Sequence, residues 1–185
     1  MADNEFGYTR WGMDWVRLAE PLSLTRPEPL LPRARSIARH GGVTLEYDNT
    51  GVRAHLQRGN QASVTYLEIT PIPRPAISAI AAHIPAPTVE LTDTLHNTLT
   101  TAGLTIAPRI TTTDCSCSAR TPRCLHYLAT CYTLARQVDE NPWLALDLQG
   151  YHRTLTEESD PHTPPPRWTS LDSLDPTTYF AIPTG

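Results

Sequence analysis

The stretch TTTDCSCSARTPRCLHYLATCYTLAR, residues 111–136, contains all four cysteines of the 185-residue chain. Four cysteines and a histidine within so short a segment indicate disulfides, a metal site or thiol redox chemistry. The chain does not open with a basic start followed by an apolar run, and no stretch approaches 18 apolar residues. We therefore expect a cytoplasmic protein without a membrane span. In a reducing compartment, clustered cysteines more often bind metal or react as thiols than form disulfides.

The spacing of the candidate ligands is Cys115-x-Cys117, six residues, and then Cys124-x-His126. Side chains two residues apart in an extended segment lie on the same side, so the first pair of cysteines can face one ion. The connection contains serine, threonine and proline, which favour a chain reversal. The second pair falls at the start of a predicted helix. Three thiolates and one imidazole make a closed tetrahedral zinc site, and one structural Zn²⁺ is the cofactor that we expect.

Three other residues of this stretch leave alternatives open. Cys131 lies seven residues after Cys124 on the predicted helix, either as a buried inert thiol or as a further ligand. Arg120 and Arg123 lie on the connection. A zinc ion with three thiolates and a neutral histidine carries a charge of −1, which these arginines would offset. They would then support the sulfurs or face solvent, or they would contact nucleic-acid phosphates.

Hydrophobic periodicity on both sides of the cysteine cluster predicts a mixture of helices and antiparallel strands. In the third strand the apolar residues change phase from Val64 and Tyr66 to Leu67 and Ile69. This change indicates a β-bulge near 66–67 or a strand that is buried on both faces. Helices are predicted at residues 11–19, 30–40, 76–84, 91–103, 125–140 and 141–150, and strands at 43–48, 52–57 and 62–70.

These elements predict an α+β fold in which a small antiparallel β-sheet has flanking helices. Residues 1–75 would form N-terminal helices and a three-stranded sheet, and 76–151 a helical segment with the cysteine-rich finger, whose core is 111–138. Residues 152–185 read as an acidic, proline-rich tail, with a linker at 154–167. The apolar residues of that tail would either dock on the core or bind a partner; they are Trp168, Leu171, Leu174, Tyr179 and Phe180.

Charge and motifs restrict the function. The net charge is −4, with 13 arginines against 11 acids in residues 1–136 and 2 against 8 in residues 137–185. A nucleic-acid surface would therefore be local and would lie before the tail. Four ligands leave no open position for water on the metal, and none of the common catalytic motifs occurs. We therefore expect no enzyme activity and no small-molecule substrate.

The segment CSCSARTPRCLH resembles the SWIM zinc finger, whose signature is C-x-C, a variable gap and C-x-H, followed by a helix. The resemblance to bacterial SWIM proteins extends over roughly residues 6–151, through WGMDWVRLA, RARSIARHGGV, GVRAHLQRG and LARQVDENPWLALDLQG. It implies a zinc-stabilised ββα-like finger with Cys115, Cys117, Cys124 and His126 as the metal ligands. One position differs, because Leu125 replaces the lysine that relatives often have between the last cysteine and the histidine.

The resemblance also implies a function in DNA transactions, as an accessory to a Snf-type helicase-like ATPase. Nucleic-acid binding would then involve Arg120 and Arg123, with weak affinity for DNA that both substitutions to alanine together remove. Leu125 removes one positive charge from the place where a phosphate contact is easiest to build. The alternative is a protein–protein adaptor whose zinc is purely structural and which does not contact nucleic acid.

Overall fold

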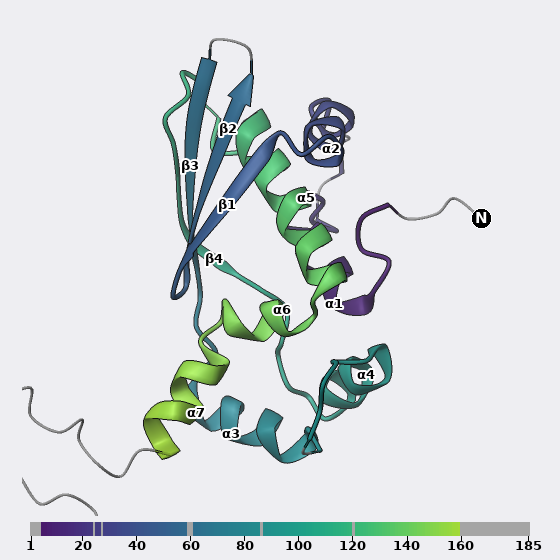
Figure 1. Cartoon of the computed structure of the whole chain (residues 1–185). Coiled ribbons are helices and arrows are strands. Elements are labelled where there is room, and N and C mark those ends of the chain that lie inside the picture. The colour runs from purple at the N-terminus through teal and green to yellow at the C-terminus, as the bar shows by residue number, and fades with distance from the viewer. Residues whose placement is uncertain are drawn as a thin grey trace, which may run out of the picture.

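A computed structural model describes residues 5–159 apart from 24, 27, 59–60, 86 and 120. In this part of the chain a single four-stranded antiparallel sheet has the strand order β1-β2-β3-β4 (Figure 1). The α+β fold class predicted from the sequence is confirmed. Within the same residues, no helix has the length and hydropathy to cross a bilayer. The strands are β1 (Val43–Asp48), β2 (Gly51–Arg58), β3 (Gln61–Ile69) and β4 (Ile110–Cys115).

Seven helices accompany the sheet in the described residues, and the longest, α5 (Leu125–Glu140), is the centre of the core. It lies between the sheet and the helices α1 and α2, and it contacts β1, β3, α1 and α2 (Figure 1). Most of its residues are buried, because apolar partners surround it on both sides. The other helices are α1 (Arg10–Ala19), α2 (Leu31–Arg39), α3 (Arg74–His83), α4 (Asp93–Thr101), α6 (Trp143–Asp147) and α7 (Tyr151–Ser159).

The strands predicted at 43–48 and 52–57 pair with each other as a hairpin. Asp48 pairs with Gly51, so the loop between β1 and β2 consists of the two residues Asn49 and Thr50. Asn49 has a φ of 54°, which asparagine adopts more readily than most residues and which the tight hairpin turns require. The sequence therefore sets the register that places Val52, Ala54 and Leu56 on the buried face of the sheet.

The third strand differs from the sequence prediction. Neither of the two alternatives is correct. β3 has no bulge near 66–67, because it keeps a regular alternation in which Thr65, Leu67 and Ile69 are all fully buried. The strand is not buried on both faces either, because Val64 is exposed. The change of register lies farther along, between Glu68 and Ile69. The apolar residues indicated the wrong phase because a threonine occupies the first buried position, while Val64 lies on the outer face and is 37 % exposed.

A fourth strand joins the cysteine-rich segment to the sheet. β4 pairs with β3, and the register sets Cys115 opposite Thr65 and Asp114 opposite Tyr66. The sequence predicted an extended segment here but only three strands in the sheet. Pairing with β3 satisfies the backbone hydrogen-bonding groups on one side of β4. It also fixes where Cys115 lies relative to α5.

The chain remains helical beyond the predicted stop at Gly150. Gly150 has a φ of 82° and ends the turn after α6, but α7 begins at the next residue and covers part of the predicted linker at 154–167. Tyr151 is buried against Trp143, with ring centroids 6.0 Å apart. This packing holds the start of α7 against α6. Residues 160–185 lie outside the described residues, and with them the predicted docking residues Trp168, Leu171, Leu174, Tyr179 and Phe180.

A buried carboxylate ties the end of α5 to the start of α1. The side chain of Asp139, 5 % exposed, accepts hydrogen bonds from the Gly7 amide at 2.6 Å and the Thr9 amide at 2.9 Å. It also accepts from the Thr9 hydroxyl at 2.8 Å. That hydroxyl in turn accepts from the Gly12 amide and caps α1. The network holds α1 against α5, the helix that carries two of the candidate metal ligands.

Candidate metal centre

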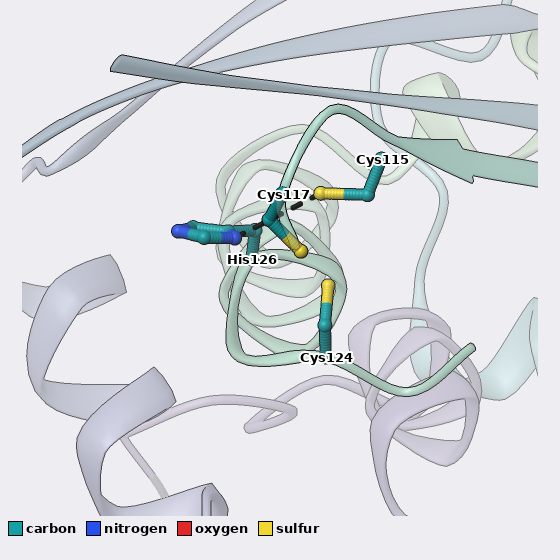
Figure 2. Close-up of side chains that lie close together, drawn as sticks. All are labelled: Cys115, Cys117, Cys124 and His126. Atoms are coloured by element: carbon teal, nitrogen blue, oxygen red, sulfur yellow. Dashed lines mark hydrogen bonds between the residues drawn. The ribbon is translucent and has the colours of Figure 1, made fainter. Parts of the chain in front are cut away.

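Four side chains converge where β4 ends and α5 begins. Cys115, Cys117, Cys124 and His126 each offer a ligand atom, and these atoms all lie within 4.8 Å of one another. Figure 2 shows the three sulfurs and one ring nitrogen of His126 turned toward a common centre. The structure thus brings together all four residues that the sequence proposed as metal ligands.

The distances fit a tetrahedral ion. A zinc ion with Zn–S bonds of about 2.3 Å and a Zn–N bond of about 2.0 Å holds its ligand atoms roughly 3.5–3.8 Å apart. The Sγ atom of Cys115 lies 3.8 Å from Nδ1 of His126. The whole set needs contractions of about 1 Å or less to reach that geometry. A metal site with these four residues as ligands is therefore stereochemically sound.

The sheet positions the first pair of ligands. The Thr65 hydroxyl on β3 donates to Sγ of Cys115 at 3.3 Å. One residue farther on, Ser116 and Val64 exchange two hydrogen bonds of 2.9 Å, one from the Ser116 amide and one to the Ser116 hydroxyl. These bonds prolong the pairing of the two strands past the end of β4. Cys117 therefore leaves the sheet from a fixed point, and the C-x-C pair faces one centre as the spacing predicted.

The start of α5 positions the second pair. Cys124 is the N-cap residue of this helix, with an extended backbone, and its Sγ accepts from the Tyr127 amide at 3.4 Å. A sulfur at this place receives both an orphan backbone amide and the positive end of the helix dipole, which favour a thiolate. His126 follows in the first turn. The prediction that both residues open the helix is confirmed.

Burial governs the protonation of the ligands. Burial raises the pKa of Cys124, which is 3 % exposed, to about 12. Burial also raises the pKa of Cys117, but hydrogen bonds from the Ala119 amide and the neighbouring thiols outweigh it and hold that pKa below its usual value. Burial lowers the pKa of His126, which favours the neutral imidazole that binds metals. A bound dication would replace the proton of Cys124, because the thiolate is the ligand form.

Cys131, the fourth cysteine, is fully buried in the middle of α5. Burial raises its pKa to about 12. The cluster of candidate ligands in the described residues does not include it. Of the two alternatives for this residue, the inert buried thiol therefore fits the structure better than a further ligand.

Arg123 turns toward the protein. Its guanidinium donates to the carbonyl oxygens of Leu18, at 3.2 Å, and Ala19, and it lies 5.8 Å from the Tyr127 ring centroid. These carbonyls belong to the last turn of α1, where backbone acceptors have no partner within their own helix. Arg123 therefore joins the finger to α1, a contact across more than 100 residues of sequence. Arg120 lies outside the described residues.

The groups that support the ligands were not predicted from the sequence. The Thr65 hydroxyl donates to Cys115, the backbone amide of Tyr127 donates to Cys124, and Ser116 bonds to Val64 and so holds the segment between Cys115 and Cys117. Thr65 left a readable signal, because it shares the period of two with Leu67 and Ile69 and so occupies a buried position. For the others the sequence gives no comparable indication.

Comparison with known proteins does not identify a family for this chain. No family model matches the chain, and no curated protein and no solved structure shows significant similarity to it. The resemblance to SWIM fingers therefore depends on the ligand spacing and on the convergence of three cysteines and one histidine between β4 and α5.

Proposed function

We propose that this chain is a non-enzymatic zinc protein of the SWIM type, in which one structural Zn²⁺ joins β4 to α5. The observation that carries the proposal is the convergence of three sulfurs and one imidazole nitrogen within 4.8 Å. Thiolate-rich sets with tetrahedral geometry select zinc over the oxygen-seeking ions magnesium and calcium. Four protein ligands fill a tetrahedral shell, so the ion has no position for a reacting water.

The proposed role is that of an accessory protein in DNA transactions, recruited through protein contacts and partnered by a Snf-type helicase-like ATPase. The ligand spacing supports the family assignment from which this role follows. The protein contact is favoured over a phosphate contact for two reasons. The net charge is −4, and the guanidinium of Arg123, one of the two arginines proposed for phosphate binding, donates to the backbone of α1.

The alternative, direct DNA binding, is distinguished by salt. In a fluorescence anisotropy titration with duplex DNA, we expect the purified zinc-loaded chain to show no affinity that falls steeply as salt rises. Protein that neutralises six or more phosphates loses about 10³-fold or more in affinity between roughly 50 and 200 mM salt. An affinity for DNA that falls in this way would contradict recruitment through protein contacts alone and would support direct nucleic-acid contact.

The variants used in the DNA titration must remain folded. Arg120→Ala tests directly whether the segment between Cys117 and Cys124 contacts DNA. Arg123→Ala also removes two charge-assisted bonds to α1, and we expect it to lower the unfolding free energy by about 2 kcal/mol. If the native chain does bind DNA, a loss of that binding in the Arg123 variant is therefore interpreted together with an unfolding curve of the same variant. Arg53→Ala, on an exposed position of β2, is the matched control for both.

A further inference from the structure

A cavity of about 440 Å³ adjoins the metal centre, between α2, the strands β2 and β3 and the start of α5. Its apolar floor consists of Leu56, which is buried, and of Ile37 and Leu125, which are half-buried. Exposed polar residues form a rim around this floor; they are Arg33, Ser36, His40 and Gln57. An apolar centre inside a polar rim is the usual arrangement of a recognition site, and the volume is in the range of ligand-binding cavities.

One positive charge of α2 remains available to a ligand. The helix carries three arginines and no acid. Arg35 forms an ion pair with Glu20, and Arg39 forms one with Glu5. Among the described residues Arg33 has no carboxylate partner, and it lines the cavity, where none of the described lining residues is an acid. A carboxylate suits this place, because a guanidinium can bind its two oxygens with two parallel hydrogen bonds.

His126 offers a second hydrogen-bond donor at the same cavity, which it also lines. Its Nδ1 lies 3.8 Å from Sγ of Cys115, and Figure 2 shows the other ring nitrogen pointing away from the three sulfurs. In the described part of the chain no hydrogen bond to that second nitrogen is found. Metal-bound histidines almost always donate this N–H to a carboxylate, a carbonyl or water. A carboxylate in the cavity is therefore a candidate acceptor for His126 as well as the counter-ion of Arg33.

The walls do not suit a nucleic-acid base. Proteins that hold single-stranded nucleic acid stack the bases on aromatic rings. Apart from the two histidines, no aromatic residue is found among the described residues that line this cavity, and its apolar surface is aliphatic. An aliphatic group with a carboxylate beside it matches both parts of the wall.

The rim favours a peptide over a free aliphatic acid. A cavity for a small molecule usually encloses most of its ligand. Here Arg33, His40 and Gln57 are exposed, so the polar contacts lie at the surface, where a peptide chain can continue beyond the cavity. The hydroxyl groups of Ser36 and Ser63 and the amide of Gln57 can also bond to a peptide backbone.

We propose that this cavity binds a partner peptide in which a leucine or isoleucine adjoins an aspartate or glutamate. The aliphatic side chain enters the apolar floor, and the carboxylate pairs with Arg33. This inference rests on the proposed function, because it names the surface through which the zinc protein is recruited. It also connects the metal to recruitment, since Leu125 and His126 at the start of α5 form one wall of the cavity.

Methyl NMR signals of the apolar floor test this docking in the native zinc-loaded chain. The probes are the capped peptides Ac-GSLEGS-NH2 and Ac-GSLQGS-NH2, which differ in one carboxylate. We expect the glutamate peptide to shift the methyl signals of Ile37, Leu56 and Leu125 saturably, with a dissociation constant on the order of 1 mM for a single anchor residue. The glutamine peptide should bind about fivefold more weakly, as expected for one exposed ion pair.

Arg33→Gln is the variant that tests the charge. It should remove the difference between the two peptides, so that both bind as weakly as the glutamine peptide binds to the native chain. The matched control is Arg53→Gln, at an exposed position of β2 outside the cavity, which should keep the preference for glutamate. Because both arginines are exposed, we expect both variants to remain folded.

The docking would be overturned by the absence of saturable shifts with either peptide, by equal affinities of the native chain for both, or by a preference for glutamate that persists in Arg33→Gln. A third probe, 4-methylpentanoate, carries the aliphatic group and the carboxylate without a peptide. Tighter binding of this acid than of the glutamate peptide would overturn the peptide and indicate a free acid as the ligand. Zinc analysis of the same samples separates two failures: a zinc-loaded chain without peptide binding contradicts only this inference, whereas a folded chain without zinc contradicts the proposed function.

Discussion

Removal of zinc is expected to abolish the cooperative unfolding transition of the native chain, or to lower its midpoint temperature by at least about 10 °C. Zinc contributes about 10–16 kcal/mol in finger peptides, whereas whole domains are stable by only about 5–15 kcal/mol. A net loss of 5 kcal/mol or more corresponds to this shift for a domain of this size, at about 2–4 °C per kcal/mol.

The structure gives the reason for so large an effect. Two of the candidate ligands, Cys124 and His126, open α5. Cys115 is the last residue of the edge strand β4, and Cys117 follows that strand. Without the ion, three thiol groups would lie together at the entrance to the core with only weak hydrogen bonds. The segment between β4 and α5 has little apolar burial of its own, so a bound ion would be the principal link there.

The measurement is differential scanning calorimetry with and without a chelator. Cys124→Ser should bind no zinc tightly and should unfold without a response to the chelator. Cys131→Ala is the matched control, because this thiol is buried on the same helix but outside the ligand cluster. It should lose some stability through a small cavity yet keep one zinc per chain and the full chelator effect. An apo protein as stable as the zinc-loaded one would contradict the account.

Asp139→Ala is expected to lower the free energy of unfolding by about 3–5 kcal/mol. The substitution leaves the Gly7 amide, the Thr9 amide and the Thr9 hydroxyl without their shared acceptor. It also frees the hydroxyl that caps α1. Because α1 packs along α5, the loss loosens the helix pair that forms much of the core.

The helix α1 approaches the Asp139 carboxylate closely at Gly12. A Cβ atom on Gly12 would lie 2.1 Å from Oδ1 of Asp139, so α1 and the carboxylate fit together only with glycine at that position. Urea denaturation provides the measurement. Glu140→Ala is the matched control, since its side chain is 63 % exposed and, among the residues that the structure describes, forms a 3.9 Å ion pair with Arg136. A loss below about 1 kcal/mol for Asp139→Ala would show that the network is not a principal contact.

The candidate metal centre could be predicted from the sequence because its four ligands lie close together along the chain. The two ligand pairs lie within twelve residues, and their spacing determines which side chains can reach one ion. The hairpin at Asn49 and the helical start at Cys124 were predictable for the same reason. Each depends on the conformational preference of a few consecutive residues.

The long-range contacts could not be predicted in this way. Asp139 meets Gly7 and Thr9 across 130 or more positions, and Arg123 meets Leu18 across 105. Local patterns give the residue types but not the partners, because the partners depend on how the helices pack. The pairing of β4 with β3 was missed on similar grounds, since strand pairing is decided by neighbours distant in sequence.

Zinc K-edge X-ray absorption of the purified native chain decides whether these four side chains hold the ion, because it reports the ligands of the ion itself. We expect one zinc per chain with three sulfur neighbours at about 2.3 Å and one nitrogen neighbour at about 2.0–2.1 Å. A folded chain without metal, or a zinc with fewer than three sulfurs and a bound water, would contradict the closed structural site.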